Sequence, residues 1–447
     1  MASGILFLII PFAIKPLTSF IDISILTTQS ASIAIFLSSL IITILLFSLP
    51  LLLLGMVSPF IIKLYSLSQV GRIGELAGKV FAVSTIGSIL GTFLPTLYFI
   101  PVLGTRATIN IFAILLIFLG LFSFKKNKMR ISILMFLLLL IIFFSNTAIK
   151  ASPNLIFEDE SAYQYIQVKK DKAGTNYLIF NEGGGIQSVY NSEKVLTGMY
   201  YDYFNILPYL VNPALTSDVE RDWSGINSEE VKKALILGLA GGTIATQFNY
   251  FFKDAIEIEG VEIDKKVIDV AKKYFGLNDS IVKIYNQDGR IFLRNTASKY
   301  DIIIVDAYRN ELYIPWTLTT QEFWNLTKGR LNKNGVIAIN VNSSSKESEL
   351  LGAISNTIAS VFKYAYITKV NDDGWNYMIT ASENELDFKT LTNLIRDKEL
   401  QNLTPAIISQ TKSLKKKPEL MVLTDNRAPI EFMTEAMVLN YIRGSID

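Results

Sequence analysis

Four short segments between Ala234 and Asp306 constrain the fold of this chain most strongly. Each stands at the end of a short run rich in Ile, Val and Leu, which is the pattern of parallel strands buried on both faces, and helical stretches separate them. The segments are Ala234-Leu-Ile-Leu-Gly238, Ala255-Ile-Glu-Ile-Glu-Gly-Val-Glu262, Asn286-Gln-Asp288-Gly289 and Tyr300-Asp-Ile-Ile-Ile-Val-Asp306. The order predicts a doubly wound α/β sheet.

Ligands bind such a sheet outside the carboxyl ends of its strands, where these segments end. The turn Gly238-Leu-Ala-Gly241-Gly242 lets the backbone approach a ligand, and Glu262 can accept both hydroxyls of a ribose. The turn lacks the G-x-G-x-x-G spacing that seats a pyrophosphate, so a nucleoside without phosphates is favoured over NAD or FAD. S-adenosylmethionine and its decarboxylated form fit that description. The alternative, that the glycines serve only a tight turn, leaves Glu262 and Asp288 at the next two strand ends unexplained.

Composition restricts both the environment and the chemistry. Half of the 447 residues are hydrophobic and the mean hydropathy is +0.35, so one part of the chain should lie in a membrane. The chain has no cysteine and no histidine, which excludes disulfides, Cys/His zinc sites, thiol nucleophiles and a Ser-His-Asp triad. Acid or base catalysis must therefore fall to Asp, Glu, Lys or Tyr, with no metal required. A net charge of +2 gives no argument for binding nucleic acid.

Five apolar runs predict a multi-pass transmembrane region in residues 1–150. Each is about as long as a helix that crosses ~30 Å of hydrocarbon. The runs lie near residues 4–20, 32–62, 79–100, 105–124 and 131–149. Pro11, Lys15 and Pro16 interrupt the first run, which could instead be a packed or interfacial helix. Small residues in the third run predict close helix packing rather than a transport pathway, namely Ser84, Gly87, Ser88 and Gly91.

The charged loops conflict with the expected cofactor. The loop after the second run and the loop after the fourth are both basic, so both should face the cytoplasm. Their charges are Lys63, Arg72 and Lys79, and Lys125, Lys126, Lys128 and Arg130. A fifth crossing would then place the rest of the chain outside, whereas an intracellular nucleoside requires it inside. We give the cofactor more weight and expect residues 151–447 to face the cytoplasm from the cell membrane.

Composition changes after residue 150, and we expect two further parts. Residues 151–230 should form a small β-sheet and a linker, and residues 231–447 the nucleoside-binding domain with a C-terminal extension. In the first of these we expect strands at 163–169, 177–180 and 186–190, a helix at about 192–210 and a surface loop at 216–229. In the second we expect helices at 265–275, 321–331 and 346–362 and further strands at 335–341, 364–368 and 376–380.

These residues together resemble the spermidine synthase family, the polyamine aminopropyltransferases, over about residues 163–341. The membrane part resembles the branch in which a multi-spanning region is fused to the synthase. The motifs that carry the resemblance are Val261-Glu262-Ile-Asp264, Asp288-Gly289-Arg290, Tyr300 to Asp306, Gly55-Met-Val-Ser-Pro59, Gly78 to Gly91, Ile100-Pro-Val-Leu-Gly104 and the tail Leu423-Thr-Asp-Asn-Arg-Ala-Pro429. The resemblance implies an α-helical transmembrane region followed by a Rossmann-like domain of the S-adenosylmethionine-dependent transferase type with a small N-terminal β-sheet.

The resemblance also implies roles for single residues. Gln164 would touch the nucleoside, Glu262 would bind the ribose, Asp288 and Gly289 would contact the adenine, and Asp306 would accept a proton. The implied reaction moves an aminopropyl group from decarboxylated S-adenosylmethionine to a small-molecule amine. Transfer of a methyl group from S-adenosylmethionine is the first alternative, and a non-catalytic membrane sensor or scaffold is the second. Membrane lipid is an expected partner, and a homo-oligomer stays open.

Three positions depart from the family's pattern for holding a cationic polyamine. Ala240 stands where the family's glycine motif has an aspartate, Tyr201 where a tyrosine-histidine pair has histidine, and Arg309 where a second aspartate is expected. Unless Arg309 points to solvent and another acid such as Glu311 replaces it, the acceptor should carry less positive charge than putrescine, or a negative group. Tyr200, Tyr201 and Tyr308 are the residues expected to line the acceptor cavity.

Overall fold

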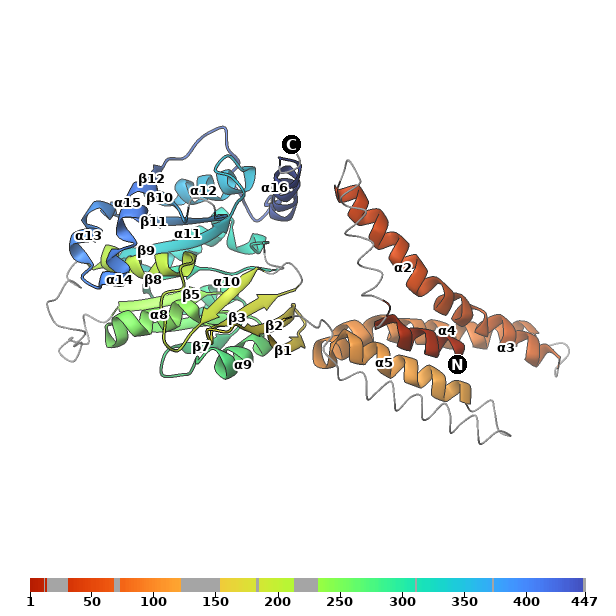
Figure 1. The fold of residues 1–447 in the computed structure, drawn as a ribbon. Coiled ribbons are helices and arrows are strands. Elements are labelled where there is room, and N and C mark those ends of the chain that lie inside the picture. Colours follow the sequence, from red (N-terminus) through yellow and green to blue (C-terminus); the bar gives the residue numbers. More distant parts are fainter. Residues whose placement is uncertain are drawn as a thin grey trace. The chain divides into compact units, whose positions relative to one another are not determined.

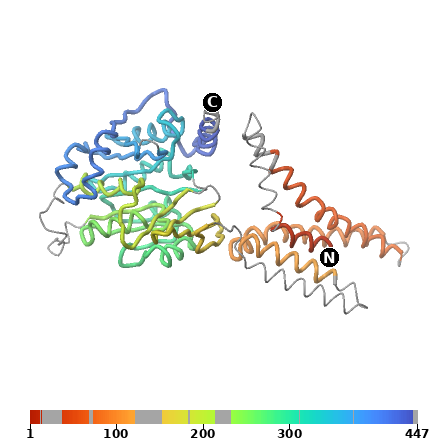
Figure 2. The backbone as a smooth tube through the Cα atoms, viewed as in Figure 1, coloured from red at the N-terminus to blue at the C-terminus, as the bar shows by residue number. Residues whose placement is uncertain are grey.

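The computed structural model describes residues 1–11, 13, 31–67, 73–121, 153–181, 185–212, 232–309, 312–371 and 374–444 (Figures 1 and 2). The chain divides into two compact units. One comprises Met1–Ala151 with Asp159–Ala162, and the other Ser152–Glu158 with Tyr163–Asp447. The expected fifth apolar run, the basic loop at 125–130 and the surface loop at 216–229 lie outside the described residues.

Long apolar helices make up the first unit. They are an N-terminal helix Ala2–Pro11, α2 (Ala31–Gly55), α3 (Val57–Ser66), α4 (Ile73–Leu94), a π-helical turn (Pro95–Phe99) and α5 (Ile100–Leu121). Two stretches, Ser39–Ser66 and Ile73–Gly120, are long and apolar enough to cross a membrane by length and composition. The second stretch contains the third expected run, 79–100, and the fourth, 105–124, up to Gly120. Gly104, with φ +81° and ψ 164°, interrupts the helical geometry between them.

Close helix packing in this unit occurs at the N-terminal helix. Leu8 packs against Ala113 and Ile117 of α5, and a Cβ on Gly4 would lie 2.7 Å from the Ala113 carbonyl oxygen. The first apolar run is therefore a packed helix over its described part. By contrast, among the described residues nothing lies within 4 Å of a Cβ built on Gly87 or Gly91, so the close contact expected along α4 is not formed there.

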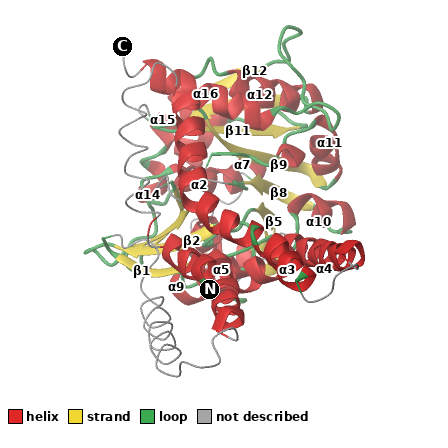
Figure 3. Cartoon of the chain, turned by 90° about the vertical axis from the view of Figure 1, so that its right-hand side faces the viewer, coloured by secondary structure: helices red, strands yellow, loops and turns green. Residues whose placement is uncertain are grey.

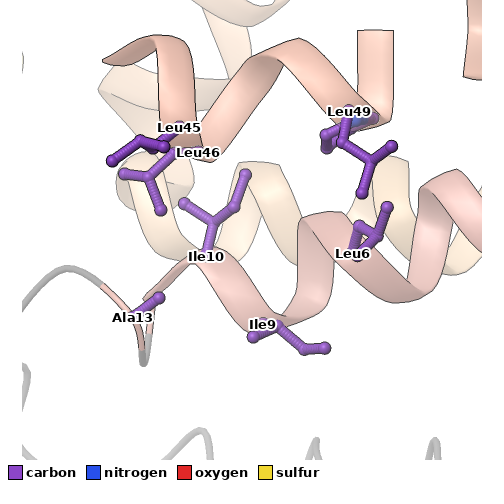
Figure 4. A pocket seen from close by; sticks show the side chains of 8 residues that line it. Leu6, Ile9, Ile10, Ala13, Leu45, Leu46 and Leu49 are labelled. Carbon is purple, nitrogen blue, oxygen red and sulfur yellow. The ribbon is translucent and has the colours of Figure 1, made fainter. Parts of the chain in front are cut away.

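An apolar pocket lies between the N-terminal helix and α2 (Figure 4). Only apolar side chains and a proline line it, so no group in it could hold a polar ligand. The lining residues are Leu6, Ile9, Ile10, Ala13, Leu45, Leu46, Leu49 and Pro50.

The second unit begins with a four-stranded sheet in the order β1-β2-β3-β4. Its strands are β1 (Leu155–Glu160), β2 (Tyr165–Lys170), β3 (Asn176–Phe180) and β4 (Ile186–Tyr190), and the last three are antiparallel neighbours. These three match the predicted strands within two residues, whereas β1 was not predicted. Ile166, Val168 and Leu178 of this sheet pack against Val267 and Val270 of α9 (Lys265–Tyr274), so the apolar stripe of that helix is core, as expected.

The main sheet has eight strands in the order β12-β10-β11-β9-β8-β5-β6-β7. Figure 3 labels β12, β11, β9, β8 and β5 of this sheet. The bounds are β5 (Lys232–Leu237), β6 (Ile256–Glu262), β7 (Lys283–Asn286), β8 (Tyr300–Val305), β9 (Leu331–Asn342), β10 (Tyr364–Lys369), β11 (Asn376–Ser382) and β12 (Thr411–Leu414). Strands β7, β6, β5, β8 and β9 are parallel, and β11 is antiparallel to both β9 and β10. The predicted doubly wound α/β fold is confirmed.

Alternate residues of each central strand enter two separate cores, one on each face of the sheet. In β5, Ala234 and Ile236 belong to one core, and Leu235 and Leu237 to the other. Helices α7 (Leu207–Val211) and α8 (Thr243–Phe252) pack in the first core, and α10 (Gly289–Asn295), α11 (Gln321–Gly329), α12 (Glu349–Val361) and α16 (Ile430–Gly444) in the second. Burial on both faces explains why the central stretches of these strands are mostly apolar.

The helix predicted at about 192–210 is wrong in its first half. The chain is irregular up to Met199, and the 3-10 helix η2 (Tyr200–Ile206) then leads into α7. The carboxylate of buried Asp202 accepts hydrogen bonds from the backbone N–H groups of Thr197 (3.0 Å) and Gly198 (2.7 Å), and Gly198 has φ +74°. These contacts fold the preceding segment back on Asp202 instead of extending the helix.

Candidate active site at the carboxyl ends of the parallel strands

The turn between β5 and α8 is built on left-handed backbone. Gly238, Ala240 and Gly242 have φ values of +89°, +47° and +84°. A Cβ on Gly238 would lie 2.4 Å from the carbonyl oxygen of Asp306, so glycine allows the ends of β5 and β8 to touch. The backbone N–H of Gly241 donates to the Ser188 Oγ of β4 at 2.8 Å, which links the turn to the small sheet.

Glu262 ends β6 and holds the same turn. Its Oε2 accepts a hydrogen bond from the backbone N–H of Ala240 and its Oε1 one from the N–H of Asp264, both at 3.0 Å. Burial raises the pKa of the Glu262 carboxyl, and these hydrogen bonds act in the opposite direction. Each carboxylate oxygen has a second lone pair, so Glu262 can position the turn and still accept hydroxyl donors.

Asp288 and Gly289 stand where β7 leads into α10. Asp288 caps that helix, since its Oδ1 accepts a hydrogen bond from the Ile291 N–H at 2.9 Å. Gln164 directly precedes β2, and is partly exposed. The antiparallel pairing places the start of β2, the end of β3 and the start of β4 at the same end of the small sheet. Ile186 begins β4, and its carbonyl oxygen accepts a hydrogen bond from the Tyr201 hydroxyl at 3.0 Å, so this end of the small sheet adjoins η2.

Asp306 directly follows β8 and receives two side-chain hydrogen bonds. The Tyr200 hydroxyl donates to its Oδ2 at 2.9 Å, and the Asn340 amide donates to its Oδ1 at 3.4 Å. Burial raises the pKa of Asp306 to about 7, while the two donors oppose that rise. A carboxyl with this pKa can take up or release a proton near neutral pH, which is what a general base requires.

The three tyrosines expected at the acceptor cavity have different positions. Only Tyr200 presents its hydroxyl to Asp306. Tyr201 is 1% exposed, stacks on Tyr200 with ring centroids 4.0 Å apart and uses its hydroxyl on the Ile186 carbonyl. The Tyr308 hydroxyl donates to the Asn340 carbonyl oxygen at 2.7 Å and accepts from the Asn342 N–H at 3.1 Å. Burial raises the pKa of all three hydroxyls, so they stay protonated near neutrality.

The positions that depart from the family pattern add no carboxylate to the site. Ala240 contributes a backbone N–H to Glu262, and Tyr201 lies in the core. Arg309 is exposed, and its backbone pairs with Tyr313. Glu311, the alternative acid to position 309, lies outside the described residues.

Asn340, which contacts Asp306, and its neighbour Asn376 were not among the site residues predicted from the sequence. The Asn376 Nδ2 donates to the Oδ1 atoms of Asn340 at 3.0 Å and of Asn342 at 2.7 Å. The available signal was a polar residue inside the otherwise apolar strand Gly335-Val-Ile-Ala-Ile-Asn-Val341. Over the described part of the chain, no three acidic side chains gather as ligands for a metal ion.

The sheet order, the glycine turn and the acids at three strand ends together define a Rossmann-like domain of the kind that binds a nucleoside. Residues 222–390 match the family model of the Spermine/spermidine synthase domain. A "Probable polyamine aminopropyl transferase" of Bifidobacterium longum is 38% identical over 210 residues, which are 47% of this chain and 42% of that protein. The "Polyamine aminopropyltransferase" of Saccharolobus solfataricus is 30% identical over 256 residues, covering 53% of this chain and 76% of that protein.

The chain belongs to the spermine/spermidine synthase family. It spans less than half of the length of the Bifidobacterium protein. The match therefore assigns the family of this domain, and the activity of the chain is proposed below. A crystal structure of a probable spermidine synthase from Corynebacterium glutamicum has 15% sequence identity and a TM-score of 0.46, covering 62% of this chain and 97% of that one.

Proposed function

We propose that this domain transfers an aminopropyl group from decarboxylated S-adenosylmethionine to a small-molecule amine, with Asp306 as the base. The observation that carries the proposal is the position of Asp306. It lies at the end of β8, in backbone contact with the glycine turn, with a pKa of about 7. A base at that point would face whatever the turn and Glu262 bind.

The chemistry of the strand ends fits a nucleoside. Glu262 would accept the ribose hydroxyls, and the backbone around Asp288 and Gly289 would border the adenine, with Gln164 approaching from the small sheet. The lone pairs left on Glu262 suit neutral hydroxyl donors better than phosphates, which a buried carboxylate would repel. When bound, the sulfonium supplies a carbon whose bond to sulfur breaks as its bond to the acceptor nitrogen forms.

The protein's own part in the reaction is alignment and proton removal. An alkylammonium has no free lone pair, so the amine must lose a proton before its nitrogen can attack. Asp306 would accept it, and the Tyr200 hydroxyl holds the carboxylate in place from one side. General bases of this kind contribute roughly 10²–10⁴-fold to the rate.

We further propose that the acceptor carries less positive charge than putrescine, or carries a negative group. Asp306 is the acid that the described residues place at this end of β8, and Ala240, Tyr201 and the exposed Arg309 offer no second carboxylate for a distal ammonium. An unpaired ammonium in a partly desolvated cavity is costly, since neighbouring charges there interact by a few kcal/mol.

We also propose that residues 1–150 are embedded in the cell membrane and that residues 151–447 face the cytoplasm. Lipid would surround the apolar helices of the first unit. Large side chains on α2 and α4 are exposed in the structure, with Leu45 62% and Val83 70% accessible, and a surface of this kind is typical of contact with hydrocarbon.

The experiment is a transfer assay on the detergent-purified full chain. Each of the two sulfonium donors is combined with putrescine, with monoamines and with amines that bear a carboxylate, and the alkylated product is identified by mass spectrometry. We expect an aminopropyl product, slow turnover of putrescine and a loss of roughly 10²-fold or more in Asp306→Asn. A methyl product from S-adenosylmethionine would replace the proposed reaction with its first alternative. Binding of a donor without turnover of any amine would favour a sensor.

A further inference from the structure

We propose that Asn340, oriented by Asn376, is a positioning residue that holds the Asp306 carboxylate in the geometry needed to accept a proton. This inference rests on the proposed role of Asp306 as the base. It adds two residues, on β9 and β11, that neither the family resemblance nor the motifs of the chain assign.

Asn340 occupies an unusual place for an amide. It lies inside β9 between the buried residues Ile339 and Val341 and is only 2% exposed. A buried amide costs free energy unless its polar atoms find partners. Here the Nδ2 donates to Asp306, the Oδ1 accepts from Asn376, and the carbonyl oxygen accepts from the Tyr308 hydroxyl.

The orientation of the Asn340 amide decides whether it stabilises or destabilises the negatively charged carboxylate of Asp306. With its NH₂ group toward the carboxylate it donates a hydrogen bond, but rotated by half a turn it would place its oxygen against a negative charge. The Asn376 NH₂ group lies on the other side and donates to the Asn340 Oδ1 at 3.0 Å. Since an N–H can only bond to the oxygen of that amide, Asn376 selects the orientation in which Asn340 donates to Asp306.

Strand register places Asn376 where its side chain can donate to the Asn340 Oδ1. Asn376 is paired with Asn342 across the antiparallel β11–β9 ladder, and Asn340 is paired with Met378. Asn340 and Asn342 are two residues apart and lie on the same face of β9, so Asn376 reaches the Oδ1 atoms of both. The second bond, at 2.7 Å to Asn342, does not involve Asp306, and the strand register places Asn376 beside Asn340 without it.

Among the described residues, three tyrosines are the titratable groups that interact with Asp306. Tyr200 and Tyr201 of η2 and Tyr308 after β8 interact electrostatically with Asp306, and each stays neutral near pH 7 because burial raises the pKa of its hydroxyl. Of these, Tyr200 alone donates to the carboxylate, and it does so on Oδ2. Asn340 donates to Oδ1. Removing it would take away one of the two hydrogen bonds that lower the pKa of Asp306, so the pKa would rise further under the effect of burial.

The test is a titration of Asp306 in the full chain, read by infrared difference spectroscopy of the carboxyl band and assigned with Asp306→Asn. We expect Asn340→Leu to move the midpoint to higher pH by about one pH unit, and Asn376→Leu to move it in the same direction by a smaller amount. Asn342→Ala is the matched control, because it removes the other partner of Asn376 and leaves the bond to Asn340. Its midpoint should stay at the natural value. Circular dichroism and the Tm of each variant show that it is folded.

Kinetics give a second reading where the transfer reaction is measurable. In Asn376→Leu the rising limb of kcat/KM against pH should shift with the titration, so that activity at pH 6.5 falls several-fold and recovers at pH 9. A purely structural role would lower activity equally at every pH. An unchanged titration in both Asn340→Leu and Asn376→Leu would overturn the inference. Because the titration needs no substrate, this result would be distinct from a failure of the proposed reaction.

Discussion

At the residue scale, the acids at the ends of β6 and β8, the two strands that flank β5, have different environments. Glu262 accepts hydrogen bonds from the backbone N–H groups of Ala240 in the glycine turn and of Asp264, whereas Asp306 accepts them from the side chains of Tyr200 and Asn340. Backbone donors are fixed by the fold and serve to hold a permanent acceptor. Burial raises the pKa of Asp306 to about 7 against the effect of its two side-chain donors, which suits the general base proposed above.

Glu262 provides the first prediction at this scale. Glu262→Ala should weaken binding of either sulfonium donor by about one to two orders of magnitude, because hydrogen bonds to a charged acceptor contribute roughly 1.5–3 kcal/mol. Isothermal titration calorimetry measures the affinity. Because the substitution also removes the partner of the Ala240 N–H, Glu262→Gln is the matched variant, which keeps one acceptor oxygen for the turn. Natural affinity in Glu262→Ala would refute the assignment of Glu262 to the ribose.

Residues at strand ends could be found from the sequence, whereas residues inside strands could not. Gly238, Glu262, Asp288 and Asp306 each interrupt an apolar run, and the parallel order of the runs brings their ends to one edge of the sheet. Asn340 is also polar, but its contact with Asp306 depends on the side to which it points and on the register of β11. Neither property can be read from one strand alone.

At the element scale, two distant motifs meet in one ion pair. The Arg290 guanidinium in α10 donates to both carboxylate oxygens of Asp425, at 2.8 and 2.6 Å, and to the Thr317 carbonyl at 3.1 Å. The Thr320 hydroxyl also donates to Asp425 at 2.7 Å. The pair lowers the pKa of Asp425, and it ties the tail at 423–429 to the helix that follows Asp288. The motif Asp288-Gly289-Arg290 and the tail motif are therefore in direct contact.

The contact between β5 and β8 yields a prediction at this scale. Gly238→Ala should lower the Tm by several degrees, because the alanine would adopt φ +89° and bring its Cβ to 2.4 Å from the Asp306 carbonyl oxygen. Strain of this kind costs roughly 1–3 kcal/mol and would displace Asp306 as well. Gly329→Ala is the control. Nothing lies within 4 Å of its Cβ, and it ends the helix α11, so its Tm should be unchanged or slightly raised. Equal Tm values for the two variants would contradict the close contact.

The elements themselves were predictable to different degrees for physical reasons. The central strands β5 and β8 were found because burial on both faces makes them largely apolar. The edge strand β12, Thr411-Lys-Ser-Leu414, was not predicted, because its residues are mostly polar and partly exposed. The strand β1 was missed because its sequence, Leu155-Ile-Phe-Glu-Asp-Glu160, ends in three acids that do not suggest a strand. The irregular segment before Tyr200 was mistaken for a helix because its structure depends on hydrogen bonds to Asp202, a residue that follows it in the chain.

At the scale of the whole molecule, the chain joins a domain with two well-buried cores to a unit whose large apolar side chains are exposed. On α2 and α4 these side chains occur on all sides of the helices, and neither helix has a polar face. An exposed apolar surface of this kind fits the proposed location of the first unit in a membrane. The composition already indicated this contrast, but the number of crossings depends on residues outside the described ranges.

The last prediction concerns sidedness, and the composition of the chain makes a direct test possible. Because the natural sequence has no cysteine, a single introduced cysteine is the only thiol available to a membrane-impermeant maleimide. Ser413→Cys lies on an exposed position of β12 in the second unit, and Ser66→Cys lies at the end of α3 beside the basic loop. We expect neither to be labelled in intact cells and both to be labelled after permeabilisation, since basic loops and a nucleoside-binding domain both belong in the cytoplasm. Two sites on the same side require an even number of crossings between residues 66 and 413. Labelling of Ser413→Cys alone in intact cells would mean an odd number, and would place the proposed active site outside the cell.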